Sequence, residues 1–392
     1  MYIETKRGFS FLGDKDLLTF NGVDFIFKRV DDVCKGDVVC IDRSSKDGGD
    51  DLEINYQHKS SKYASNIKEV NLPKKYSPDL GEWLGYIVAN GSTSQNCVMM
   101  SSNESAKTIN YEELVARLFG ISAVKENCSG AARSFKIHSV VVKGFLNHLT
   151  GGFKTARYKS VPYGVFESSK ETQRRFLRAL FDCDASKLKS SFEYSSASEE
   201  LAKGVVSLLL GFGIISRAKR AYAKNYPEHT YWKVLISGEN EDLLYDKILF
   251  DSFKYLPIEH KKRNTNIDVI YGFKEYLVNE LNKTRKILGV NSAGTYKCND
   301  KTVRFTASRT ILKISHKELT YQTLKCIFDD FNNCCLEQKE CLSCAINRIA
   351  LVIKGNYFLD VVDVVDCEKE LDYDLPFQGF VIKEQFNESI LQ

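Results

Sequence analysis

Two stretches of the chain repeat one pattern, and this repeat limits the possible folds more than any other feature of the sequence. The stronger copy covers residues 176–186, an apolar run that ends in two carboxylates, Asp182 and Asp184. The weaker copy covers residues 80–92 and places Asn90 where the stronger copy has Asp184. Both runs have the length and apolar content of a buried helix. The repeat therefore predicts two similar helices, each with a polar residue at its C-terminal end.

The segments that follow the two helices also repeat. Each helix precedes a short β-like stretch, a second helix that ends in Phe-Gly-Ile, and a strand that carries a lysine. The two strand lysines are Lys136 and Lys233. The common order of these landmarks predicts an α+β fold with two αββαββα units, at residues 80–155 and 156–250.

Small residues on one face of each helix indicate how the two units meet. Gly85 and Ala89 in the first helix, and Ala179 and Cys183 in the second, are spaced four apart and share a helix face. Two such faces can approach backbone against backbone, which would bring both helix ends into one cleft. Carboxylates held there would suit divalent cations and phosphate oxygens, because Mg²⁺ prefers oxygen ligands. A nearby lysine would stabilise the charge of a leaving oxygen.

The two helices resemble the paired motifs of the LAGLIDADG homing endonucleases, of the two-motif, intein-encoded kind. Residues 177–185 match the nine-residue motif position by position, except that Ala185 replaces the usual glycine. Residues 83–91 keep that glycine, but Asn90 replaces the usual acid. The resemblance extends over residues 80–250. It implies a monomer in which two saddle-shaped sheets bind a long, pseudo-palindromic DNA duplex.

The resemblance also implies a metal site at the two helix ends. Mg²⁺ is the expected cofactor, with Mn²⁺ as a substitute, and the inner acid Asp182 is expected to be a structural partner. Lys136 and Lys233 resemble the cleft lysines of the family. The expected catalytic residues are Asp184, Asn90, Lys136 and Lys233, and the expected metal ligands are Asp184, Asn90, Ala185 and Gly91.

Asn90 is the main departure from the family pattern. Its amide oxygen is able to bind Mg²⁺ but carries no charge, so one metal position should be weakened. We therefore expect an enzyme that nicks one strand, cuts slowly, or has lost cleavage and retains DNA binding. The alternative to an endonuclease is a sequence-specific DNA-binding protein, a repressor or a targeting factor, on the same fold.

Basic residues surround the stronger motif. From Arg133 to Lys189 there are twelve Lys or Arg against four Asp or Glu, although the net charge of the whole chain is only +4. Such a segment suits a polyanion, and an ordinary solvated face is the alternative interpretation. The residues expected to contact DNA are Arg133, Lys187, Lys189, Arg217, Lys219, Arg220, Lys224 and Tyr231.

Composition is that of a soluble globular protein, with 43% hydrophobic and 27% charged residues. No apolar run reaches the ~18 residues of a membrane span, and the first residues have no signal-peptide hydrophobic core. We therefore expect a protein with no membrane partner, in the cytoplasm or wherever its target DNA resides.

The two ends of the chain look like one β domain divided in two. Residues 2–37 resemble interior strands of an intein splicing domain, and Tyr373–Leu375 resembles a strand of its second half. These segments predict a degenerate HINT-like domain from residues 1–45 and 346–392. Splicing needs an N-terminal Cys or Ser and a terminal Asn, whereas the chain begins with methionine and ends with glutamine. We expect a free-standing endonuclease descended from an intein, or alternatively a trimmed part of a longer intein.

Two further segments complete the predicted organisation. Residues 46–79 are polar and contain paired glycines, which favours a linker. Residues 251–345 are mainly helical by pattern, and five of the twelve cysteines lie between Cys326 and Cys344. The spacing of these cysteines is irregular, which favours buried thiols over a zinc site.

Overall fold

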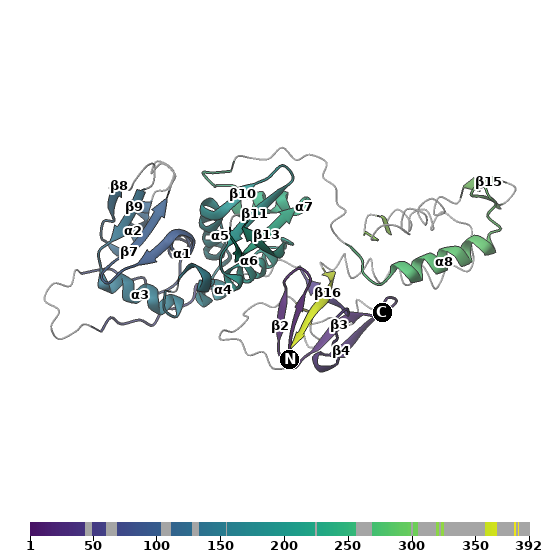
Figure 1. The fold of residues 1–392 in the computed structure, drawn as a ribbon, viewed down its shortest axis with the longest axis horizontal. Helices are drawn as coiled ribbons and strands as arrows, with labels where there is room; N and C mark the ends of the chain where they lie inside the picture. The colour runs from purple at the N-terminus through teal and green to yellow at the C-terminus, as the bar shows by residue number, and fades with distance from the viewer. Residues whose placement is uncertain are drawn as a thin grey trace. The chain divides into compact units, whose positions relative to one another are not determined.

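Two compact units make up the protein in the computed structural model (Figure 1). The terminal unit comprises Met1–Ser44 and Lys262–Gln392, and the central unit comprises Ser45–Lys261. The structure describes residues 1–43, 49–59, 69–102, 111–127, 133–153, 155–223, 226–255, 269–298, 301–304, 319–320, 323–324, 357–366, 380–381 and 383.

The central unit contains two sets of elements in the same order. The first set is α1 (Pro78–Asn90), β6 (Gly91–Thr93), β7 (Val98–Ser102), α2 (Tyr111–Phe119), β8 (Val124–Asn127), β9 (Arg133–Ile137) and α3 (Val140–Thr150). The second set is α5 (Lys170–Asp184), β10 (Ala185–Lys187), β11 (Ser191–Ser196), α6 (Glu199–Gly211), β12 (Arg217–Ala223), β13 (Tyr226–Ser237) and α7 (Glu239–Leu244) followed by the π-helix η3 (Tyr245–Leu249). The short helices η2 (Ala156–Tyr158) and α4 (Tyr163–Glu167) connect the sets. Each set has the αββαββα order that the sequence repeat predicts.

Each set forms a four-stranded antiparallel sheet, with the order β6-β7-β9-β8 in the first and β10-β11-β13-β12 in the second. Side chains alternate between the two faces of a strand. In β9, Phe135 and Ile137 are buried on the helix side of the sheet, so Lys136 lies on the outer face. In β13, Val234 and Ile236 are buried in the same way, which places Lys233 on the outer face of the second sheet.

The helices α1 and α5 pack with their backbones close together. A Cβ atom added to Gly81 would lie 2.5 Å from the carbonyl oxygen of Thr172. One added to Gly85 would lie 2.5 Å from the carbonyl oxygen of Phe176 and 2.8 Å from the Cβ of Ala179. No larger residue fits at these glycines unless a helix moves. The close approach predicted for Gly85 and Ala179 is therefore confirmed.

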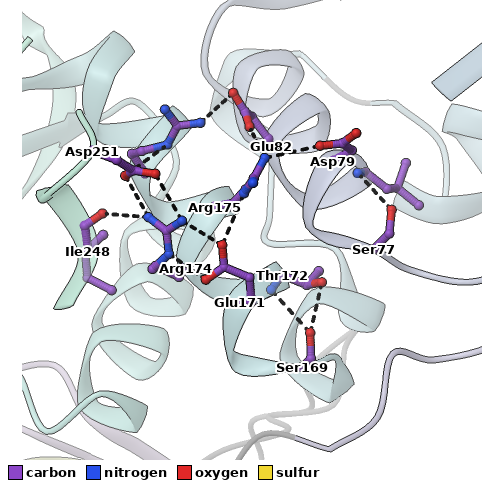
Figure 2. A network of polar contacts seen from close by, with 12 residues as sticks. Ser77, Asp79, Glu82, Ser169, Glu171, Thr172, Arg174, Arg175, Ile248 and Asp251 are labelled. Carbon is purple, nitrogen blue, oxygen red and sulfur yellow. Dashed lines mark hydrogen bonds and ion pairs between the residues drawn. The ribbon is translucent and has the colours of Figure 1, made fainter. Parts of the chain in front are cut away.

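Ion pairs join the N-terminal halves of the same two helices (Figure 2). Arg175 of α5 lies 3.2 Å from a carboxylate oxygen of Asp79 and 3.1 Å from one of Glu82, both in α1. Arg178 makes a second contact with Glu82. Arg174 binds Asp251, which follows η3, at 2.7 Å. The contacts of Arg175 and Arg178 fix how α1 and α5 are aligned along their common interface.

The segment that leads into α1 docks on the central unit where it is described. The carboxylate of Asp51 accepts hydrogen bonds from the hydroxyls of Ser169 and Thr172, at 2.7 and 2.8 Å, at the start of α5. Two backbone hydrogen bonds of 2.7 and 2.8 Å join the described parts of the segment to each other. A polar composition favours a linker over residues 46–79, but here the polar groups make specific hydrogen bonds, so the described part of this segment belongs to the folded unit.

The terminal unit contains a six-stranded sheet built from both ends of the chain. Its strands are β1 (Tyr2–Thr5), β2 (Ser10–Leu12), β3 (Asp16–Phe20), β4 (Phe25–Arg29), β5 (Val38–Asp42) and β16 (Tyr357–Asp366). The strand order is β2-β1-β16-β5-β3-β4, so β16 pairs with β1 on one side and β5 on the other (Figure 1). The two ends of the chain thus share one β sheet, and the short helix η1 (Val30–Asp32) connects β4 to β5.

The terminal unit also contains the helix α8 (Lys274–Ile287). It is followed by a hairpin of β14 (Thr295–Cys298) and β15 (Lys301–Arg304). The ring of Phe273, just before α8, lies 6.3 Å from the ring of Phe20 in β3. The cysteines from Cys326 to Cys344 and the Tyr373–Leu375 stretch lie outside the described residues. Among the described residues, no helix has the length and apolar character of a membrane span.

Candidate functional site

The two motif helices end in the same way. Asp184 is the last residue of α5 and Asn90 the last residue of α1. The next residues, Ala185 and Gly91, are extended and begin β10 and β6. An abrupt change from helix to strand therefore places one polar side chain and one extended backbone carbonyl at each helix end.

Lys159 binds the end of α1. Its ammonium donates hydrogen bonds to the carbonyl oxygens of Gly91 and Ala89, at 3.0 and 3.3 Å, and lies 5.1 Å from the ring centre of Phe153. Only 9% of the residue is exposed. Burial lowers the pKa of Lys159 to about 8, while the charge of Asp184 opposes this shift. A cation at a helix C-terminus is favourable, because the last carbonyl groups lack partners within the helix.

Lys254 binds the end of α5 in a similar manner. Its ammonium donates to the carbonyl oxygens of Ala185 at 2.9 Å and Asp182 at 3.1 Å. The hydroxyl of Tyr255 also donates to Ala185, at 2.6 Å. Each motif helix thus has a lysine on its terminal carbonyl groups, contributed by the segment that follows the last helix of its own set.

The electrostatic environment of Asp184 links the two helix ends. Burial raises the pKa of Asp184 to about 6, against the charges of Lys159 and Lys254, which lower it. Lys159 is held by α1 and Lys254 by α5. Because both ammonium groups act on the same carboxylate, the ends of α1 and α5 form one polar site.

Sequence reasoning missed Lys159 and Lys254. A usable signal was present, since both lysines stand in a repeated Lys-x-x-Pro pattern, at residues 159–162 and 254–257. The expected cleft lysines, Lys136 and Lys233, occupy equivalent places on the outer faces of β9 and β13. Each forms an ion pair within its own sheet, Lys136 with Glu126 at 2.5 Å and Lys233 with Glu193 at 2.7 Å.

The outer face of the second sheet carries several of the residues expected to contact DNA. In the strand register, Lys219 of β12 lies opposite Lys233 of β13, and Arg217 lies opposite Leu235. Tyr231 is on the same face as Lys233, two positions away. These side chains form a basic surface with an aromatic group at one end.

Arg220 and Lys187 lie on the helix side of the same sheet. Arg220 pairs with Trp232 in the register, and its guanidinium lies 5.4 Å from the ring centre of Tyr222. Lys187 binds the carboxylate of Glu241, whose side chain is fully buried. Both residues were expected to contact DNA, but strand alternation places their side chains on the helix side of the sheet and not on the outer face.

The structure gives less detail for three other residues that were expected to contact DNA. Lys189 is exposed in the bend between β10 and β11. Arg133 begins β9, and only its backbone is described. Lys224 lies outside the described residues.

The donor atoms at the helix ends fit a hard divalent cation. They are the carboxylate of Asp184, the amide of Asn90 and the carbonyl oxygens of Gly91 and Ala185, all of them oxygen ligands of the kind that Mg²⁺ prefers. The carbonyl oxygen of Gly91 accepts a hydrogen bond from Lys159, and that of Ala185 accepts one from Lys254 and one from Tyr255, so a metal ion at Ala185 would have to displace one of these donors. Among the described residues, no group of three or more His, Cys, Asp or Glu side chains forms a metal cluster. Asp184 is charged and Asn90 is neutral, so the last residues of the two helices are unequal as ligands.

A protein-family model described as a LAGLIDADG-like domain matches residues 171–248. The matched region runs from α5 to η3 and thus contains the second set of elements almost completely. This part of the central unit is therefore similar to a LAGLIDADG-like domain.

Curated relatives match the chain over a small part of their own length. The replication factor C small subunit of Methanocaldococcus jannaschii is 31% identical over 206 residues, which are 51% of this chain and 11% of that protein. The replication factor C small subunit of Thermococcus kodakarensis is 32% identical over 48% of this chain and 22% of that protein. An A-type ATP synthase subunit of Pyrococcus abyssi is 27% identical over 62% of this chain and 24% of that protein. The chain spans a quarter or less of each relative.

Similar solved structures include the homing endonuclease I-DmoI and the protein DUF199/WhiA. The homing endonuclease I-DmoI in complex with DNA and Mn has a TM-score of 0.33 and 12% identity, over 46% of this chain and 98% of that one. Full-length DUF199/WhiA from Thermatoga maritima has a TM-score of 0.30 and 15% identity, over 71% of this chain and 91% of that one.

Proposed function

We propose that this protein is a site-specific, divalent-metal-dependent DNA endonuclease of the LAGLIDADG kind. The observation that carries the proposal is the polar site at the helix ends, where Asp184 lies under the influence of both Lys159 and Lys254. A carboxylate and two ammonium groups suit metal-assisted hydrolysis of a phosphodiester. The match of residues 171–248 to a LAGLIDADG-like domain supports the same function.

Asp184, Asn90 and the carbonyl groups of Gly91 and Ala185 would hold the metal ion. A Mg²⁺ or Mn²⁺ ion held by these groups would supply positive charge and lower the pKa of a bound water. Lys159 and Lys254 would bind the non-bridging oxygens of the scissile phosphate and stabilise the charge that develops on the leaving oxygen.

The outer faces of the two sheets would bind the DNA duplex. A β surface is able to enter the major groove, where the four base pairs present distinct edges. Lys136 and Lys233 lie on these faces at equivalent places, and we assign them to DNA contact in preference to the chemical step. The proposed interface also includes Lys189, Arg217, Lys219 and Tyr231. Two unlike sets of elements in one chain suit a long, pseudo-palindromic target that is bound by a monomer.

Asn90 makes the two halves of the site unequal. Its neutral amide binds a cation more weakly than the carboxylate of Asp184 does, so one strand should be cut more slowly than the other. A protein that binds its target without cutting is the second candidate function, and the same substitution favours it.

The test uses a supercoiled plasmid that carries the DNA flanking the natural reading frame, with Mg²⁺ or Mn²⁺. We expect the wild type to produce nicked circles faster than linear DNA, and Asn90→Asp to raise the yield of linear DNA about tenfold or more. Asp184→Asn should abolish both products, whereas Glu199→Gln, at an exposed position in α6, should match the wild type. Full linearisation by the wild type at the Asn90→Asp rate would contradict the inequality of the halves. Tight binding with no cleavage by either protein would favour the second function.

We further propose that the protein descends from an intein and that the terminal unit is a degenerate HINT-like domain. Three matched proteins have names of unlike activities, namely a subunit of replication factor C, a subunit of an ATP synthase, and an aminotransferase. A segment shared by such unlike proteins, and small relative to each, is expected of an inserted element. The sheet built from both chain ends also fits a domain that an endonuclease interrupts.

A further inference from the structure

The segment after η3 folds back onto α5 through one hydroxyl group. The hydroxyl of Ser252 donates to the carboxylate of Asp182 at 2.5 Å. It also accepts hydrogen bonds from the backbone N–H groups of Lys254 at 3.1 Å and Tyr255 at 3.2 Å. Ser252 therefore connects the inner acid of the motif to the backbone of the two residues that bind the end of α5.

Lys254 and Tyr255 return these contacts through their side chains. The ammonium of Lys254 binds the carbonyl oxygens of Asp182 and Ala185, and the hydroxyl of Tyr255 binds Ala185. The backbone of this segment is thus fixed by Ser252 while its side chains reach the site. We call Asp182 and Ser252, with the N–H groups of residues 254 and 255, the Ser252 latch.

Stability of the fold does not explain why the carboxylate of Asp182 is buried. Asp182 is 2% exposed, and burial raises its pKa to about 6. Among the described residues, its Oδ2 atom has no hydrogen-bond partner. Val88 occupies the equivalent position in α1 and is also 2% exposed. The fold therefore accepts an apolar residue at this place, and a buried carboxylate costs stability that a valine would not.

We propose that Asp182 and Ser252 are positioning residues, which hold Lys254 at the end of α5 for the reaction in the second half of the site. Neither residue touches the phosphate in this scheme. They act through the backbone of the segment that carries Lys254. The inference rests on the proposed endonuclease function, but the position of Lys254 is measurable without any cleavage.

The first test measures the acylation rate of Lys254 by mass spectrometry, with exposed Lys189 as the internal reference. Ser252→Ala removes the hydroxyl that accepts from the N–H groups of residues 254 and 255, so the ammonium of Lys254 should leave its carbonyl partners more often and become about tenfold more reactive. Ser252→Thr keeps a hydroxyl and should retain the wild-type rate. Ser216→Ala is the matched control, because it removes a buried hydroxyl of the same unit that has no hydrogen-bond partner in the described structure. Unchanged reactivity of Lys254 in Ser252→Ala would overturn the proposal.

The second test separates positioning from DNA binding. We expect Ser252→Ala to lower the single-turnover cleavage rate about tenfold while target affinity, measured in Ca²⁺, changes by less than about twofold. Ser252→Thr should restore the rate. Asp182→Val places the residue of the first motif in the second and should give the same loss without unfolding. A loss of affinity equal to the loss of rate would contradict a positioning role.

The two proposals fail in different ways. If Lys254 becomes reactive in Ser252→Ala but the wild type cuts no DNA, the latch stands and the endonuclease function fails. If the wild type cuts DNA and Lys254 keeps its wild-type reactivity in Ser252→Ala, the latch fails and the endonuclease function stands.

Discussion

Burial shifts the pKa values of the ionisable residues at the ends of α1 and α5. Asp182 and Asp184 have pKa values raised to about 6, and Lys159 has a pKa lowered to about 8. Desolvation disfavours the charged form of both kinds of group, whereas opposite charges nearby restore it. The charges of Lys159 and Lys254 therefore favour the ionised form of Asp184.

The raised pKa of Asp182 predicts a pH-dependent cost in stability. Between pH 3.8 and about 6 the native carboxyl holds a proton that the unfolded chain has lost, so the free energy of unfolding falls as pH rises through this window. Asp182→Asn cannot ionise and should be about 2–3 kcal/mol more stable than the wild type at pH 8, with the difference vanishing near pH 4. Urea unfolding followed by tryptophan fluorescence reports on the central unit, because both tryptophans, Trp83 and Trp232, lie there. A difference that is constant over this pH range would contradict the assigned pKa.

Neighbouring residues on opposite faces of β12 provide a test of the DNA interface. Lys219 lies on the outer face and Arg220 on the helix side. Lys219→Ala should reduce the slope of log affinity against log salt by about one, since one fewer phosphate is neutralised. Arg220→Ala removes the same charge from the other face and should change the slope by less. Equal effects in a salt titration would argue against binding through the outer face.

At the scale of elements, α1 and α5 combine two kinds of contact. Gly81 and Gly85 allow the backbones to touch, and the ion pairs of Arg175 and Arg178 align the helices along their length (Figure 2). Arg178 is 9% exposed, so its pairing with Glu82 excludes most water. Breaking a buried pair leaves an uncompensated charge, which makes this contact specific for one alignment of the helices.

Gly85→Ala should separate the motif helices. Its new Cβ would meet the carbonyl oxygen of Phe176 at 2.5 Å, and a backbone atom cannot move aside as a side chain does. We expect a loss of about 1–3 kcal/mol in the free energy of unfolding, measured by tryptophan fluorescence in urea. Gly211→Ala in α6 is the control, because its Cβ meets only the flexible end of Lys170. Equal stability of the two variants would show that the helices are not in close contact.

At the scale of the whole molecule, two units are built from three stretches of chain. The central unit is continuous, whereas the terminal unit needs β16 between β1 and β5. These strands are more than three hundred residues apart in sequence, with β1 ending at Thr5 and β16 beginning at Tyr357. The sheet therefore depends on pairing between distant segments, which forms slowly relative to local structure.

A charge inside β16 should unfold the terminal unit alone. Val362 is fully buried in that strand, while Val364 is 42% exposed. Val362→Asp should remove hydrogen-exchange protection from β1 and β5, because an unpaired buried carboxylate costs several kcal/mol. Val364→Asp should retain protection in both strands. In either variant α1 and α5 should keep their protection, and a loss there would show that the two units unfold together.

The sequence alone determined the repeated elements and the contact between the motif helices. The expected helices at residues 80–91 and 172–184 appear as α1 at Pro78–Asn90 and α5 at Lys170–Asp184. Helix periodicity, capping residues and the spacing of small residues are local properties of the chain, so they can be read directly from the sequence of each repeat. The acid at the end of α5 and its neutral counterpart in α1 follow from the same register.

Only the tertiary structure decided which charges surround that acid. Lys254 lies about seventy positions after Asp184 and Lys159 a similar distance after Asn90, and each reaches its helix end because the last helix of its set folds back. The faces of Lys219 and Arg220 were likewise set by strand register, which a one-residue shift would reverse. Sequence patterns describe the residues along one helix or strand. A site assembled from several elements depends on which distant segments the tertiary fold brings together.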